Sequence, residues 1–94
     1  MDFKPPPEIQ ALVGRQVVLD TDSSYIYIGL LEKVGADYLT MVNVDVHETA
    51  DSKTTKESYA HETKRLGTRN NRKLTYIRAA RVVSLAALDD IISF

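Results

Sequence analysis

The sequence predicts a small all-β protein: a strongly bent, five-stranded open barrel behind a short N-terminal helix. β-branched and aromatic residues gather in short runs between turn residues, which is typical of strands. Gly29 interrupts the second of these runs, and a glycine inside a strand marks a sharp bend or a close backbone approach. Short strands in this order can form a small barrel with few free sheet edges, and SH3-like barrels and OB-folds stay open as alternatives.

The first element is a predicted helix over residues 8–14. Ile9, Leu12 and Val13 fall at i, i+3 and i+4, so they share one helical face. Prolines precede this segment and are tolerated in a first helical turn. Gly14 can adopt the left-handed conformation in which helices end.

Three extended runs follow the helix. Residues 16–21 and 25–34 predict two strands joined by polar turn residues, and therefore a hairpin. Residues 38–47 alternate well enough to predict a third strand. Its expected core residues are Leu39, Met41 and either Val42 or Val44.

Residues 48–71 form a long polar insertion. The segment is rich in Thr, Lys, Glu and Asn and cannot bury enough apolar surface to order itself independently. We expect a long loop, or an extended hairpin in which residues 57–66 prolong the neighbouring strands. Residues 73–78 and 81–85 then predict two short strands, and residues 86–94 a helical turn or one more extended stretch.

Length and composition predict one domain over residues 1–94. A chain of this size with 44% hydrophobic residues can bury a single compact core. Its apolar runs fall far short of the roughly 20 residues of a membrane helix, and its N-terminus does not resemble a signal peptide. Cysteine is absent, which fits a reducing compartment. We therefore expect a cytoplasmic protein with no membrane partner.

The net charge of −1 conceals a strong asymmetry. Residues 1–62 carry a net charge of −6, and residues 63–88 contain seven basic residues and no acidic one. Such polarisation can steer an anionic partner. Alternatively, the two halves pair with each other within the fold or across subunits.

Two segments resemble the motifs of a known family. Val13–Leu19, followed by Tyr27–Leu31 and Val34, resembles the first Sm motif of Sm, LSm and Hfq proteins, with its Gly-x-Leu. Ile77–Leu85 is similar to the second Sm motif, normally Ile-Arg-Gly followed by an apolar strand. The chain thus looks like a divergent member of the Sm-like superfamily. The resemblance implies a bent five-stranded sheet whose subunits join edge to edge into a homo-oligomeric ring.

The resemblance also implies a site for uridine-rich, single-stranded RNA, where the loop after the second strand meets the Arg-Gly turn. Arg78 matches the family arginine, and Tyr38 falls at or next to the stacking position. Leu39 stands where the family has its base-reading Asn, unless the register slips, and Ala79 replaces the glycine. Phosphate contacts are expected from the basic residues of and after the insertion: Lys64, Arg65, Arg69, Arg72 and Lys73.

Each of these assignments has a plainer alternative. Tyr38 is also consistent with a packing aromatic at the barrel rim, which is the commoner role of aromatics in strands, and Arg78 with a solvated or ion-paired arginine. The basic insertion is equally consistent with a flexible solvated loop. Uridine specificity is the least supported of the implied properties, because the residues at the Asn and Gly positions differ.

The sequence contains little evidence for a metal site or for catalysis. His47-Glu48 and His61-Glu62 are potential metal ligands, but such pairs are common in polar loops. No phosphate-binding glycine loop or nucleophile elbow is present. We therefore expect no enzyme, no cofactor and no metal site. The expected function is a ring-forming Sm-like protein that binds single-stranded RNA; the alternative is an assembly module that engages a protein partner through its insertion.

Overall fold

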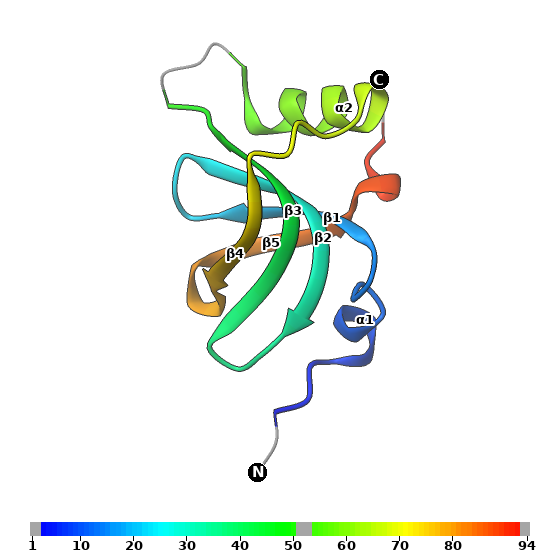
Figure 1. Cartoon of the computed structure of the whole chain (residues 1–94), viewed down its shortest axis with the longest axis vertical. Coiled ribbons are helices and arrows are strands. Elements are labelled where there is room, and N and C mark those ends of the chain that lie inside the picture. The colour runs from blue at the N-terminus through cyan, green and yellow to red at the C-terminus, as the bar shows by residue number, and fades with distance from the viewer. Residues whose placement is uncertain (1–2, 51–53, 93–94) are drawn as a thin grey trace.

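The chain forms one bent antiparallel sheet in the computed structural model, which describes residues 3–50 and 54–92 (Figure 1). The strand order is β4-β3-β2-β1-β5, so β4 and β5 are the two edges and the sheet is open. The predicted all-β fold is confirmed. The strands are β1 (Gln16–Thr21), β2 (Tyr25–Val34), β3 (Tyr38–Glu48), β4 (Arg72–Arg78) and β5 (Val82–Ala87).

Short helical elements flank the sheet. The N-terminal helix α1 (Pro7–Gln10) is shorter than predicted, because the chain tightens into turns before Gly14, whose φ is +88°. The 3-10 turns are η1 (Ala79–Arg81), which joins β4 to β5, and η2 (Leu88–Asp90), which follows β5. No helix within residues 3–50 and 54–92 has the length and apolarity needed to span a bilayer.

The insertion contains a helix, α2 (Lys56–Leu66), so the prediction of a loop or extended hairpin is wrong for this segment. Thr55 caps α2, since its side chain accepts a hydrogen bond of 3.1 Å from the Ser58 N–H. The buried residues of α2, Ala60 and Thr63, are small, so the sequence lacks the apolar periodicity that marks a helix. Figure 1 shows α2 lying across one end of the sheet.

The backbones of β2 and β3 approach each other closely at Gly29. A Cβ atom on Gly29 would lie 2.9 Å from the Asn43 carbonyl oxygen and 3.0 Å from the Val44 Cα. Pairing between the two strands shifts register here, and Asn43 has a φ of +52°. The close backbone approach predicted at Gly29 is therefore confirmed.

Both faces of the sheet bury apolar side chains. The larger cluster lies inside the bend and consists of Val17, Leu19, Leu31, Leu39, Met41, Val44 and Ile77. A smaller cluster joins the opposite face to α2 and η2: Val18, Ile26, Ile28, Ala60 and Leu88. Because of the irregularity at Asn43, Met41 and Val44 both belong to the larger cluster, whereas Val42 is only partly buried. Of the two predicted alternatives, Val42 and Val44, the core residue is therefore Val44.

Candidate nucleic-acid interface

Tyr38 and Arg78 are direct neighbours in the sheet. Tyr38 begins β3, Arg78 ends β4, and the two residues are paired in the ladder. The Arg78 guanidinium carbon lies 6.0 Å from the centroid of the Tyr38 ring, at the outer limit of a cation–π contact. Tyr38 is 46% exposed, so much of its ring is accessible to solvent. The structure therefore brings together the two residues predicted to form a stacking site.

Backbone hydrogen bonds hold the turn on which Tyr38 lies. The Gly35 N–H donates to the Tyr38 carbonyl oxygen at 2.9 Å and closes the turn between β2 and β3. The Ala79 N–H donates to the Asp37 carbonyl oxygen at 2.8 Å and links this turn to the end of β4. The β2–β3 turn and η1 therefore form one connected rim at the end of the sheet opposite α2 (Figure 1).

Two hollows open at this rim and share Asp37 and Tyr38. The first, which we name the rim hollow, has a volume of about 330 Å³ and is lined by Ala36, Asp37, Tyr38, Arg78 and Ala80. The second, the outer groove, has a volume of about 620 Å³ and is lined by Lys33, Gly35, Asp37, Tyr38, Thr40 and Tyr76. An aromatic ring, a guanidinium and a carboxylate thus surround a space open to a flat ligand.

Leu39 does not belong to this surface. Its side chain is 6% exposed and packs in the larger core cluster, opposite Ile77 in the ladder. The prediction of a ligand contact through Leu39 is therefore wrong, because alternation along β3 turns it inward and leaves Tyr38 and Thr40 to line the outer groove.

Ala79 takes part through its backbone rather than its side chain. It begins the 3-10 turn η1, and within the described residues Asn43 is the one non-glycine residue with a positive φ. A glycine is therefore not required at this turn. The methyl group of Ala79 packs against the larger core cluster.

The residues predicted to contact phosphate lie away from the rim hollow. Lys64, Arg65 and Arg69 belong to the end of α2 and the loop after it, and Arg72 and Lys73 begin β4. Arg72 and Arg78 are six residues apart on one strand, which is about 20 Å at roughly 3.3 Å per residue. The Lys64 ammonium group is also engaged, since it donates to the Ile91 carbonyl oxygen. The structure thus separates the basic cluster from Tyr38 and Arg78.

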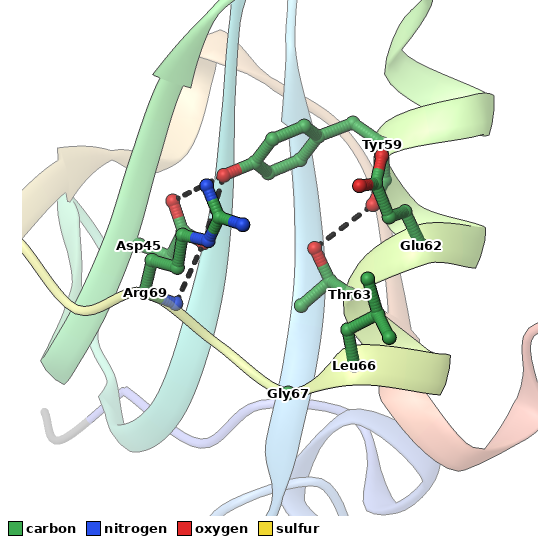
Figure 2. Close-up of a pocket in the computed structure, with 7 residues that line it drawn as sticks. All are labelled: Asp45, Tyr59, Glu62, Thr63, Leu66, Gly67 and Arg69. Atoms are coloured by element: carbon green, nitrogen blue, oxygen red, sulfur yellow. Dashed lines mark hydrogen bonds between the residues drawn. The ribbon is translucent and has the colours of Figure 1, made fainter.

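A buried carboxylate that the sequence did not reveal lies beneath α2. Asp45 is 2% exposed, and both of its carboxylate oxygens lie 2.8 Å from the Tyr59 hydroxyl, which donates (Figure 2). The Arg69 backbone N–H donates to Asp45 Oδ2 at 3.0 Å. A cavity of about 50 Å³ lies beside this cluster. These bonds join the middle of α2 and the loop after it to β3.

The environment of Tyr59 changes its acidity. Burial, followed by the hydrogen bond to Asp45, raises the pKa of Tyr59 to about 12. His47 stacks on the Tyr59 ring, with centroids 4.0 Å apart and planes inclined by 5°. His47 thus contributes to packing, and the described parts of the chain hold no cluster of three or more potential metal ligands.

Comparisons with known proteins show which structures have a similar fold. No protein-family model matches the sequence, and no curated protein is significantly similar to it. Among solved structures, a chain of the NatC complex bound to CoA is 15% identical, with a TM-score of 0.56 over 93% of this chain and 88% of that chain. A chain of the NatC complex bound to Gag peptide and CoA is 14% identical, with a TM-score of 0.55 over 83% and 87%.

A third similar structure is the Sm protein of Pyrococcus abyssii in complex with a uridine heptamer. It is 10% identical, with a TM-score of 0.58 over 90% of this chain and 99% of that chain. Identities this low establish the fold alone. Together with the strand order and the close backbone approach at Gly29, the similarity shows that this chain has an Sm-like fold.

Proposed function

We propose that the chain assembles edge to edge into a ring and binds single-stranded RNA at the rim hollow. The observation that carries the proposal is the exposed Tyr38 ring, with the Arg78 guanidinium near it, beside a hollow of about 330 Å³. The structural similarity to an Sm protein in complex with a uridine heptamer supports it.

The chemistry of the rim hollow suits an unpaired base. Single-stranded RNA offers bases that are free to stack on aromatic side chains, and each such contact is worth about 1–3 kcal/mol. Arg78 would support the stacked base and attract the phosphate backbone. The basic cluster at the far end of β4 would contact phosphates farther along the strand.

The two free edges of the sheet support assembly. β4 and β5 have no neighbour on their outer sides within the described chain, and their unpaired backbone groups can bind another strand. Each edge also exposes large apolar side chains, Leu74 and Tyr76 on β4 and Val83 on β5. Pairing of β4 in one subunit with β5 in the next would cover both edges.

The test is a titration of labelled uridine and adenosine heptamers at about 50 mM and about 200 mM salt. We expect binding that weakens as salt rises, because phosphate contacts release counterions. Arg78→Ala is expected to weaken binding about tenfold, because it removes the support of the stacked base and one attraction to the phosphate backbone. Arg15→Ala removes the same charge from an exposed residue outside the rim hollow and is expected to have little effect. Absence of binding at micromolar protein would contradict the proposal.

A second candidate function is an assembly module without an RNA site. The similarity to chains of the NatC complex favours it, since those chains belong to a protein assembly. The helix α2 would then present the partner surface, and the Tyr38–Arg78 pair would be a packing contact. Under this alternative, Arg78→Ala leaves assembly and partner binding unchanged and no RNA heptamer binds.

A further inference from the structure

We propose that Asp37 reads the base edge in the rim hollow and makes the site prefer guanine over uracil. This inference rests on the proposed RNA binding and specifies which base the site selects. It follows from the position of the Asp37 carboxylate, from its lack of other partners, and from the pattern of donors and acceptors on the bases.

Asp37 is positioned next to the stacking ring. It lines both the rim hollow and the outer groove together with Tyr38, and its backbone carbonyl is held by the Ala79 N–H at 2.8 Å. Asp37 is exposed, and among residues 3–50 and 54–92 no hydrogen bond or ion pair engages its carboxylate. The backbone is therefore ordered while both carboxylate oxygens are available to a ligand.

The remaining lining residues leave few groups that can read a base. The side chains of Ala36 and Ala80 offer only methyl groups, and Tyr38 supplies the stacking surface. Arg78 is a donor without acceptors, whereas the ionised carboxylate of Asp37 is an acceptor without donors. The side chains of the rim hollow therefore include one charged donor and one charged acceptor, with no amide.

This combination matches guanine. The Watson–Crick edge of guanine places the N1–H and N2–H groups side by side, so that a carboxylate can accept from both. Its O6 and N7 atoms are acceptors, which arginine commonly contacts. Uracil presents one N–H between two carbonyl oxygens, and these oxygens would be repelled by the carboxylate. Adenine and cytosine each offer an amino group beside an acceptor nitrogen, and should bind with intermediate affinity.

The experiment compares four labelled heptamers on the full-length protein: uridine, adenosine, cytidine, and alternating uridine and guanosine. We expect the guanosine-containing heptamer to bind about tenfold more tightly than the uridine heptamer, the low end of the discrimination by one bidentate contact. Asp37→Asn should remove this preference and improve uridine binding, because an amide can both donate and accept. Glu32→Gln is the matched control, since it removes one exposed acidic charge nearby on β2 but lines neither hollow.

The outcomes separate this inference from the proposed function. Equal affinities for all four heptamers, or the same change in Glu32→Gln as in Asp37→Asn, would overturn base reading by Asp37 and leave RNA binding intact. If no heptamer binds, both proposals fail. Loss of the guanosine preference in Asp37→Asn alone would support the inference.

Discussion

At the scale of single residues, the Asp45 carboxylate is a buried group that needs hydrogen-bond donors. It is buried between β3 and α2, where an unpartnered carboxylate would cost several kilocalories per mole. The Tyr59 hydroxyl and the Arg69 N–H satisfy it. Tyr59 and Arg69, which follow Asp45 by 14 and 24 positions in the sequence, thus donate hydrogen bonds to the same carboxylate.

Removing the Tyr59 hydroxyl should destabilise the protein. Tyr59→Phe keeps the ring that stacks on His47 but leaves the buried carboxylate with one donor fewer, at a cost of about 1–3 kcal/mol. Urea unfolding at neutral pH measures this loss. Tyr76→Phe is the control, because Tyr76 is 62% exposed and donates no hydrogen bond within the described chain, so its free energy of unfolding should not change.

The same variant should alter the dependence of stability on pH. The pKa of Tyr59 is raised from 10.0 in the unfolded chain to about 12 in the fold, so the unfolded state loses this proton first as pH rises. The stabilisation is complete below pH 10 and is lost between pH 10 and about 12. Burial raises the pKa of Tyr27 in the same direction, so Tyr59→Phe should flatten this decline without abolishing it. An unchanged slope would contradict the assignment.

At the scale of elements, α2 depends on contacts more than on its own sequence. Its buried residues are Ala60 and Thr63, Tyr59 is partly buried, and its first turn is closed by the Thr55 cap. The Lys56 ammonium group also donates to Asp20 and to the carbonyl oxygens of the β1–β2 turn. The helix is thus held by polar contacts at its start and by small apolar contacts in its middle.

Loss of the cap should therefore weaken α2. Thr55→Ala removes the acceptor for the Ser58 N–H and should lower the free energy of unfolding by about 0.5–2 kcal/mol. Faster hydrogen exchange confined to the first turn of α2 would locate the effect. Ser58→Ala keeps the N–H donor and should leave stability nearly unchanged; an equal loss in both variants would contradict a capping role.

At the scale of the whole molecule, one residue of the basic segment forms an ion pair with one of the acidic segment. The Arg81 Nε–H donates to Asp22 Oδ1 at 2.7 Å, and so joins the basic and acidic parts of the chain. Arg65, Arg72 and Lys73 remain exposed, and no ion pair engages them in the part of the chain that the structure describes. Pairing within the fold therefore accounts for some of these charges, and the steering of an anionic partner by the others stays a prediction.

The proposed assembly into a ring can be tested on the whole molecule through its mass in solution. The proposed ring predicts a mass several times 10.5 kDa by light scattering, and Val83→Glu should reduce it to that of the single chain. Val83 is 65% exposed on the free edge of β5, so the substitution affects the edge and not the core. Leu66→Glu changes an exposed leucine on α2 and should leave the mass unchanged. A wild-type protein that is already monomeric would contradict ring formation.

The sequence by itself determined the strands, the close backbone approach at Gly29 and part of the candidate site. Alternating and β-branched runs are local patterns, and they predicted all five strands to within two residues at either end. Gly29 was recognisable because it interrupts a run of β-branched and aromatic residues, and the structure places it where a Cβ atom would clash with the Asn43 carbonyl. Tyr38 and Arg78 were predicted together from the motifs, and the β3–β4 ladder places them side by side.

Only the tertiary structure decided the rest. The helix α2 could not be predicted because small residues and polar contacts hold it, and these carry no periodic signal. The inward orientation of Leu39 depends on strand register, and the exposure of Asp37 beside Tyr38 depends on how the β2–β3 turn meets η1. A sequence records which groups are present, but contacts between distant segments decide which of them share a surface.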